Sequence, residues 1–295
     1  MRYDSPLRYP GGKARFAALL TQIIELNNLS GCSYFEPYAG GAGAALRLLR
    51  EDVVSEIHLN DVDHRITAFW NVALDEPERF VDAILSVPVG IAEWKRQQRV
   101  YLRADASKPF DLGFSAFYLN RCNRSGVLLG GAPIGGYAQT GKWRIDARFN
   151  REDLAKRILA IARKREQIHI TNMDALAFLA KHLPHGRERK RVFAYLDPPY
   201  YSNGRRLYLN FYRDRDHRSL SRYIQRQGPL RWVMSYDDAS FIRDLYANCA
   251  ISHFLLQYSL QRKRQARELL ITPFPLRLPA SVASIDKTEC KAATA

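Results

Sequence analysis

Short apolar runs alternate with helix-like stretches before about residue 74 and again after about residue 166. This alternation is typical of strands joined by helical crossovers, and it predicts an α/β fold with a mainly parallel, doubly wound sheet. The expected strands are residues 34–38, 57–61, 168–172, 192–196, 232–235, 254–258 and 269–272, and the expected helices are residues 14–26, 44–50, 65–74, 175–182, 219–225 and 241–246.

The alternation breaks between residues 75 and 165. Helix-like patches at residues 77–85, 92–102 and 152–164 flank a polar, glycine-rich stretch at residues 125–142. We interpret residues 75–165 as an inserted, mostly helical domain that either forms a lid or reads a substrate. The sheet domain then comprises residues 1–74 and 166–280, and the small, polar residues 281–295 are expected to form a loose tail.

The composition is that of an ordinary folded protein, since 46% of the 295 residues are hydrophobic and 25% are charged. The four cysteines are widely spaced and form no CxxC pair, which predicts reduced thiols and no metal site. The chain has no run of 18 apolar residues and begins without an apolar signal core. We therefore expect a cytoplasmic protein that does not span a membrane.

The formal net charge of +15 favours a polyanionic partner, and nucleic acid is the commonest polyanion in the cytosol. A solvated basic surface without a partner is the alternative. Arginine outnumbers lysine in the basic clusters, which suits forked contacts to phosphate. The clusters are residues 187–191, 205–206, 213–218 and 262–264.

A glycine-rich turn, Glu36-Pro37-Tyr38-Ala39-Gly40-Gly41-Ala42-Gly43, follows the first expected strand and opens a helix. Glycines allow close approach of a ligand to the backbone, and the helix N-terminus supplies N–H donors. Asp61 follows the next strand, where a carboxylate can hold both ribose hydroxyls of an adenosine-containing cofactor. The pattern favours a nucleoside cofactor, although a NAD site, another nucleotide site or a plain tight turn would also fit it.

The segment Asp197-Pro198-Pro199-Tyr200 stands at the carboxyl end of the expected strand 192–196, where ligands bind in sheets of this kind. The two prolines are rigid and offer carbonyl oxygens without N–H donors. A carboxylate, a carbonyl and an aromatic ring therefore lie together, which suits an amino group on a flat ring. A capped proline turn without chemistry is the alternative interpretation.

A Gly-Gly turn with a basic residue, Tyr9-Pro10-Gly11-Gly12-Lys13, precedes the first expected helix. Together with the two segments above, it resembles the Dam-like family of DNA adenine N6-methyltransferases, from Pro6 to about Pro273. Further matching segments, in the family's order, are Asn172-Met173-Asp174, Phe211-Tyr212, Ser235-Tyr236 and Glu268-Leu269-Leu270-Ile271-Thr272.

The resemblance implies a Rossmann-like catalytic domain, S-adenosylmethionine as methyl donor, double-stranded DNA as substrate and an inserted target-recognition domain, without a metal. It implies that Asp197 and the Pro198 carbonyl accept the hydrogens of the adenine amino group and that Tyr200 stacks on the flipped base. We expect a monomer. The residues implied to hold the cofactor are Tyr9, Lys13, Glu36, Gly40, Gly43, Asp61, Asp174 and Asp197, and those implied to contact DNA are Asn120, Arg121 and Arg124.

The chain departs from the family pattern in three places. Arg124-Ser125-Gly126-Val127 stands where an aromatic-Asn-Gly-Leu sequence is more usual, Ala42 lies between glycines, and Tyr9 replaces a tryptophan of some members. The first of these puts the target sequence in doubt and leaves the reaction unaffected.

Three alternatives remain at this point. A cytosine N4-methyltransferase would use the same fold, but Ser is more usual there than the first residue of the strip, Asp197. A DNA-binding module that has lost catalysis would not need the intact strip. A nicotinamide oxidoreductase would explain the glycine turn and Asp61, but neither the strip nor the charge.

Overall fold

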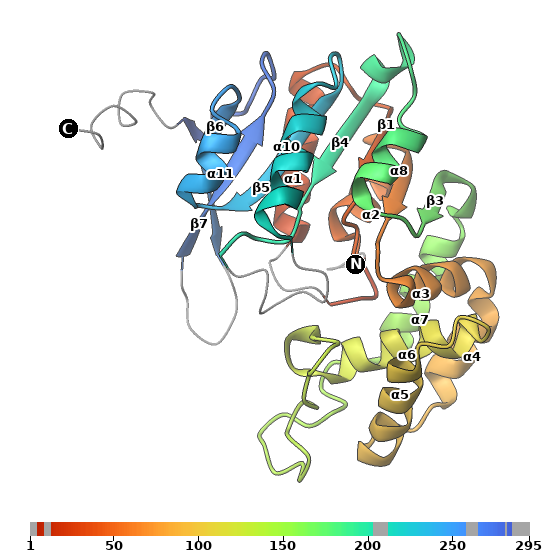
Figure 1. Ribbon diagram of the computed structural model, residues 1–295. Coiled ribbons are helices and arrows are strands. Elements are labelled where there is room, and N and C mark those ends of the chain that lie inside the picture. The colour runs from red at the N-terminus through yellow and green to blue at the C-terminus, as the bar shows by residue number, and fades with distance from the viewer. Residues whose placement is uncertain (1–4, 9–12, 203–211, 258–264, 281, 285–295) are drawn as a thin grey trace.

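The computed structural model describes residues 5–8, 13–202, 212–257, 265–280 and 282–284. Within these segments, strands form one eight-stranded sheet, and helices lie on both of its faces and below it (Figure 1). The strands are β1 (Cys32–Glu36), β2 (Val54–Asn60), β3 (Ile168–Thr171), β4 (Val192–Leu196), β5 (Arg231–Asp237), β6 (Ala250–Gln257), β7 (Gln265–Thr272) and β8 (Ala283–Ser284). The helices are α1 (Lys13–Leu26), α2 (Gly43–Arg50), α3 (His64–Asp75), α4 (Pro77–Ser86), α5 (Ile91–Arg103), α6 (Pro109–Cys122), α7 (Arg151–Ala162), α8 (Ala175–His182), α10 (Asp214–Gln225) and α11 (Ser240–Leu245).

The sheet has the order β3-β2-β1-β4-β5-β7-β6-β8. Strands β3, β2, β1, β4 and β5 pair in parallel, whereas β7 runs antiparallel to both β5 and β6. The chain proceeds outward from β1 to β3 and then returns to β4 on the other side of β1. The carboxyl ends of β1 and β4 therefore flank a topological switch point, where ligands bind in doubly wound sheets. The predicted fold class, α/β with a mainly parallel, doubly wound sheet, is confirmed.

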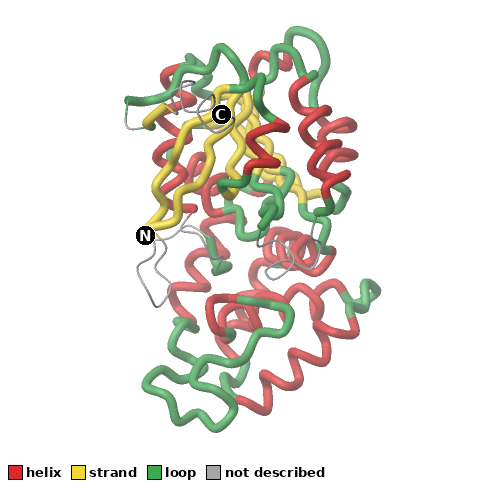
Figure 2. The backbone as a smooth tube through the Cα atoms, turned by 60° about the vertical axis from the view of Figure 1, so that its left-hand side comes forward, coloured by secondary structure: helices red, strands yellow, loops and turns green. Residues whose placement is uncertain are grey.

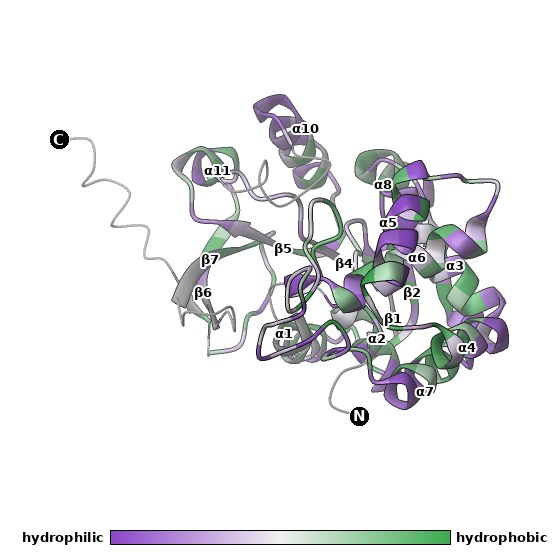
Figure 3. Ribbon diagram, turned by 90° about the horizontal axis from the view of Figure 1, so that it is seen from below, coloured by the Kyte–Doolittle hydropathy of each residue, from purple (hydrophilic) through white to green (hydrophobic). Residues whose placement is uncertain are grey.

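Alternate residues of the central strands point to opposite faces of the sheet and pack into two separate hydrophobic cores. Tyr34, Phe193 and Tyr195 join the cluster that contains the apolar side of α1, whereas Phe35, Ala194 and Leu196 join the cluster that contains α8, α10 and α11. This division follows from the two-residue period of a strand. Helix α10 is amphipathic (Figure 3), and it buries His217, Leu220, Ser221 and Ile224 at helical spacing against the second core.

Helices α3 to α7 gather below the sheet, and the long loop between α6 and α7 extends farthest from it (Figures 1 and 2). Helix α3 packs closely on α6, where a Cβ atom at Gly113 would lie 2.7 Å from the carbonyl oxygen of Ala68. This approach of two backbones requires glycine at that position. The division of the chain at residue 74 stays a prediction, and the packing of α3 on α6 favours an earlier start of the helical part.

Three expectations about local structure were wrong in detail. Helix α6 had no counterpart among the expected elements, β6 begins at Ala250 instead of residue 254, and α10 begins at Asp214 instead of residue 219. In the expected tail, Ala283 and Ser284 pair with β6 as β8, while residues 281 and 285–295 lie outside the described residues. Among the described helices, none is long and apolar enough to cross a membrane.

Candidate active site

The segment Asp197–Tyr200 follows β4 directly, and residues of β5 and β7, the next two strands on one side of β4 in the sheet, hold both of its polar side chains. Ser235 Oγ of β5 donates to Asp197 Oδ1 at 2.6 Å. The Tyr200 hydroxyl donates to Glu268 Oε1 of β7 at 2.7 Å. Ser235 and Glu268 are 2% and 3% exposed, so both anchors lie in the protein interior. The carboxylate and the aromatic ring are therefore fixed relative to each other at the carboxyl edge of the sheet.

A second hydrogen bond, from Tyr195, holds the Ser235 hydroxyl that supports Asp197. Tyr195 Oη lies 2.9 Å from Ser235 Oγ, and because the serine proton points to Asp197, the tyrosine donates to the serine. Burial, followed by the charge of Asp197, raises the pKa of Tyr195, so its hydroxyl stays protonated. This chain of hydrogen bonds orients one oxygen of the Asp197 carboxylate.

Asp237, at the end of β5, holds the backbone that leaves the strip. Its two carboxylate oxygens accept the N–H groups of Tyr201 and Ser202, each at 2.7 Å. Sequence reasoning did not single out Asp237, although it directly follows the matched pair Ser235-Tyr236. The strip is thus anchored by β4, by the hydrogen bonds of its side chains and by the hydrogen bonds of the residues that follow.

The glycine-rich turn and Asp61 contact each other. Gly40 N–H donates to Asp61 Oδ2 at 3.0 Å, and Asp63 N–H donates to Asp61 Oδ1 at 2.9 Å. The Gly40 carbonyl accepts a 2.9 Å bond from the buried Trp70 indole. Gly40 has a φ of 47°, which favours glycine. Burial raises the pKa of Asp61 to about 6, although the two N–H donors lower it.

Asn60, at the end of β2, joins three segments that border this edge of the sheet. Its amide nitrogen donates to the carbonyls of Pro37 at 3.1 Å and Met173 at 3.0 Å. Its amide oxygen accepts from Met173 N–H and from Thr171 Oγ1, both at 3.0 Å. The side chain is 1% exposed. Sequence reasoning missed Asn60, whose only signal was its place next to Asp61.

The turn after β1 is also connected to the segment that follows the strip. Tyr38 Oη and Tyr212 Oη lie 2.7 Å apart, and burial raises the pKa of both hydroxyls, that of Tyr212 to about 12. Tyr212 belongs to the matched pair Phe211-Tyr212, of which residue 211 lies outside the described residues. The carboxyl ends of β1, β2, β4 and β5 and the amino-terminal half of the antiparallel strand β7 thus border one polar site.

A family model described as D12 class N6 adenine-specific DNA methyltransferase matches residues 9–261. The chain belongs to this family. It is therefore an enzyme that methylates the N6 amino group of adenine in DNA, and nothing favours cytosine methylation or a binding module without catalysis. A search of curated proteins gave no match.

The other cofactor residues expected of this methyltransferase lie as follows. Glu36 is buried and accepts from the Tyr34 hydroxyl at 3.1 Å. Asp174 caps α8 by accepting from the N–H groups of Leu176 and Ala177. Gly43 begins α2, and a Cβ atom there would meet nothing within 4 Å, so packing alone does not require glycine. Tyr9 lies outside the described residues; Lys13 begins α1, and its side chain is likewise outside them.

The three residues expected to contact DNA have different surroundings. Asn120 is fully buried, where it accepts from Arg8 N–H at 2.6 Å and donates to the Arg8 and Gly126 carbonyls. Arg121 is 8% exposed, and its guanidinium donates to the Arg148 carbonyl. Arg124 is exposed. Asn120 and Arg121 are therefore placed to stabilise the loop by internal hydrogen bonds. Of the three residues, only Arg124 has an exposed side chain that DNA could reach.

The loop between α6 and α7 presents two further side chains that sequence reasoning did not name. Tyr137 is 60% exposed and Trp143 is 63% exposed, which is unusual for such large aromatic residues. The loop is nevertheless held in shape, because Gln139 donates to the Ile134 carbonyl at 2.8 Å and accepts from Ile145 N–H at 2.9 Å. The loop thus exposes the aromatic side chains of Tyr137 and Trp143 and the basic side chain of Arg124, while hydrogen bonds within the loop hold its backbone.

Proposed function

We propose that Asp197, Pro198 and Tyr200 bind a flipped-out adenine of double-stranded DNA beside S-adenosylmethionine. The observation that carries this proposal is the pair of buried anchors, Ser235 on Asp197 and Glu268 on Tyr200. A base held between a fixed carboxylate and a fixed ring has a defined position and orientation. A transfer reaction gains much of its rate from holding the two reactants in such a defined geometry.

The cofactor side of the proposal rests on the acceptor capacity of Asp61. Each of its oxygens accepts one N–H donor from the described residues, and a carboxylate oxygen can accept a second. Two further donors therefore fit, as the paired hydroxyls of a ribose would provide. Glu36, Gly40, Gly43 and Asp174 border the same edge, and we propose them as further cofactor contacts. Tyr9, Lys13 and Asp197 complete the proposed set.

S-adenosylmethionine, when bound, supplies a methyl group that its sulfonium already activates. The adenine amino group is a poor nucleophile, because its lone pair is delocalised into the ring. Asp197 and the Pro198 carbonyl accept its two hydrogens, which turns the lone pair toward the methyl carbon. Bound beside this amine, the cofactor would supply the methyl group to the nitrogen and would leave as a neutral thioether. The amine then releases one proton toward Asp197 and solvent, so no metal is needed for this step.

Adenine N6 is inaccessible inside a stacked duplex, so the base must leave the helix at a cost of a few kcal/mol. Stacking on Tyr200 recovers about 1–3 kcal/mol of this. We propose that Arg124, Tyr137 and Trp143 of the loop contact the duplex around the vacated position. The charge of +15 supports binding to phosphate. Action as a monomer stays a prediction.

Replacing Tyr200 tests the stacking role, because two variants separate the ring from the hydroxyl. Tyr200→Phe keeps the ring and loses the bond to Glu268, so we expect turnover on duplex DNA to fall about tenfold or less. Tyr200→Ala loses both, and we expect a further loss of about 10-fold to 100-fold. Fluorescence of a 2-aminopurine placed at the target adenine reports flipping and stacking. Equal activity of the two variants would exclude stacking as the contribution of Tyr200.

Asp61 makes cofactor binding dependent on pH. A carboxylate that accepts two ribose hydroxyls must be ionised, and its pKa in the free protein is about 6. We therefore expect the dissociation constant for S-adenosylmethionine to be constant above this pKa and to rise about tenfold per pH unit below it. The effect of pH on the stability of the free enzyme has the opposite sign. The pKa of this carboxyl is higher than in the unfolded chain, so its proton stabilises the folded state at low pH, and this stabilisation is lost as the pH rises to about 6.

Calorimetric titration of the cofactor on both sides of that pKa measures the effect. Asp61→Asn is the matched variant, because it keeps the size of the side chain and removes the charge. It should bind weakly at every pH and lose this part of the pH dependence. An affinity that is unchanged in Asp61→Asn would remove Asp61 from the cofactor site.

A further inference from the structure

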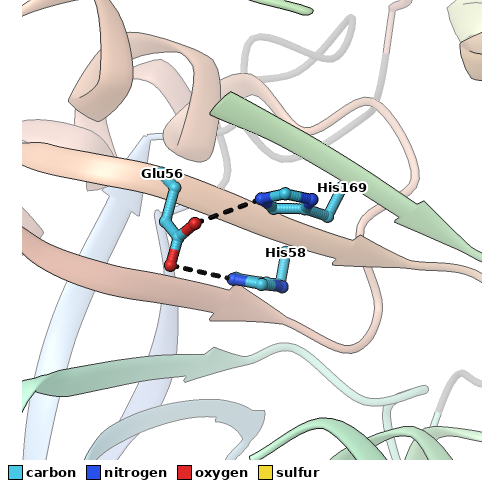
Figure 4. A group of neighbouring side chains, drawn as sticks. All are labelled: Glu56, His58 and His169. Carbon is cyan, nitrogen blue, oxygen red and sulfur yellow. Dashed lines mark hydrogen bonds and ion pairs between the residues drawn. The ribbon is translucent and has the colours of Figure 1, made fainter. Parts of the chain in front are cut away.

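Three side chains with metal-binding chemistry meet on the sheet, outside the site described above. Figure 4 shows Glu56 between His58 and His169, with both imidazoles directed at its carboxylate. Glu56 Oε1 lies 3.3 Å from His58 Nε2, and Glu56 Oε2 lies 3.1 Å from His169 Nε2. The three ligand atoms all lie within 4.8 Å of one another. The methyltransferase reaction assigns no role to any of them.

The register of the strands brings these residues together. Glu56 and His58 are two residues apart on β2 and so share a face, and His58 is the direct neighbour of His169 on β3. The two imidazoles stack with their centroids 4.4 Å apart, and Phe35 stacks on the other side of His58 at 4.2 Å. Ser33 donates to Glu56 Oε1 at 2.6 Å. The ligand groups therefore have packed and hydrogen-bonded supports, as ligating residues in metal sites usually do.

We propose that Glu56, His58 and His169 bind a divalent transition-metal ion of the zinc class. Ligand atoms around a tetrahedral zinc ion lie about 3.4 Å apart, given zinc–nitrogen and zinc–oxygen distances near 2.1 Å. The nitrogen–oxygen distances are close to that separation, at 3.3 Å from His58 to Oε1 and 3.1 Å from His169 to Oε2, and one ligand atom from each residue lies within 4.8 Å of the other two. Two imidazoles and a carboxylate suit zinc, cobalt or nickel better than magnesium or calcium, which prefer oxygen ligands.

The site is accessible to an ion from solvent, and it has room for another ligand. The side chains of His169, Glu56 and His58 are 44%, 36% and 20% exposed. Three protein ligands leave a fourth position for water, as in zinc sites that are not purely structural. Strand β3 is the edge of the sheet and pairs only with β2 among the described strands. A metal ion joining His58 to His169 would therefore fasten the edge strand to its neighbour.

The expectation of no metal rested on the spacing of the cysteines, which carries no information about histidines. The two histidines are far apart in the chain, and only the parallel pairing of β2 with β3 brings them together. The described cysteines, Cys32, Cys122 and Cys249, are buried, and none belongs to the cluster. This proposal is independent of the proposed cofactor and base contacts.

Titration of the untagged, full-length protein with cobalt and with zinc tests the site. Every protein carries Cys290→Ser, which removes the cysteine outside the described residues. We expect one cobalt ion to bind with visible absorption typical of four-coordinate cobalt, and one zinc ion to displace it. His169→Gln and Glu56→Gln each remove one ligand and should weaken zinc binding by about 100-fold or more, since even the loss of an outer-shell partner costs 10-fold to 100-fold. His185→Gln alters an exposed histidine outside the cluster and should bind as the parent does.

Thermal unfolding is the second readout. Zinc should raise the melting temperature of the parent protein and of His185→Gln, but not that of His169→Gln or Glu56→Gln, because only a bound ion stabilises the folded state. His169 is exposed enough that its replacement should leave the fold intact, and far-ultraviolet circular dichroism checks this. Absence of binding to the parent protein, or equal binding by all four proteins, would overturn the proposal.

Discussion

Replacing Asp197 by alanine is expected to reduce methyl transfer to adenine by about 1,000-fold or more, close to complete loss. The carboxylate accepts a hydrogen of the amino group in the proposed mechanism, and removal of one positioned hydrogen-bonding group at a reacting centre typically costs 100-fold to 1,000-fold in rate. Alanine also removes the group that positions the nucleophilic nitrogen. Single-turnover transfer of a labelled methyl group to duplex DNA measures the chemical step.

Two matched variants distinguish the contribution of the Asp197 carboxylate from that of the Ser235 hydrogen bond that positions it. Asp197→Asn keeps the shape but presents an amide, so it should be nearly as inactive as alanine. Ser235→Ala keeps the carboxylate and removes only its 2.6 Å hydrogen bond, so we expect a loss of about tenfold. Circular dichroism and thermal unfolding establish that each variant is folded. Substantial turnover by a folded Asp197→Ala protein is incompatible with the proposed mechanism.

Replacing Asn60 by leucine is expected to reduce the free energy of unfolding by about 4 kcal/mol, because each buried polar group that is left unpaired costs about 1–3 kcal/mol. The variant keeps the volume and leaves four groups without the Asn60 amide: the carbonyls of Pro37 and Met173, the N–H of Met173, and the hydroxyl of Thr171. Cofactor affinity should fall as well, since these segments border the cofactor edge. Denaturant unfolding and calorimetric titration measure the two effects.

Asn172→Ala is the control for Asn60. Asn172 is exposed, and its amide donates to the Asp61 carbonyl at 2.7 Å. Water can replace an exposed hydrogen bond, so this change should cost less than about 1 kcal/mol. A similarly small cost for Asn60→Leu would show that Asn60 does not hold the three segments together.

Features with a local signal were predictable from the sequence. Strand β4 is one apolar run and was expected at residues 192–196, and α8 was expected at residues 175–182 because of its short apolar pattern. Asp197 and Tyr200 were identifiable because the strip is contiguous. The fold class followed from the alternation of strands and helices, which depends on hydrophobic periodicity alone.

Helix α6 had no such signal. Residues 112–122 are all buried, so the helix lacks the polar side that makes a helical period visible in a sequence. The same burial explains why the side chains of Asn120 and Arg121 form hydrogen bonds inside the protein. The family resemblance implied DNA contacts for both residues, and in the structure their side chains bind the Arg8 and Arg148 backbones. Contact of these two residues with DNA stays a prediction. Polarity in a sequence does not distinguish a surface contact from an internal hydrogen bond.

Pairs that depend on register were also beyond local reasoning. Ser235 was matched as part of a motif, but its bond to Asp197 follows from the pairing of β5 with β4. Glu268 reaches Tyr200 from β7, an antiparallel strand whose position in the sheet the alternation does not reveal. The acceptor groups around Asn60 come from three separate segments, which only the assembled sheet brings together.

The central claim is that the enzyme transfers a methyl group to N6 of adenine through the Asp197–Tyr200 strip. Mass spectrometry of nucleosides, after incubation of duplex DNA with the enzyme and isotope-labelled S-adenosylmethionine, tests it most directly. We predict labelled N6-methyl-2′-deoxyadenosine as the methylated nucleoside, and none with Asp197→Ala. Labelled N4-methylcytosine in its place, or undiminished N6-methyladenine from the Asp197→Ala protein, would contradict the account.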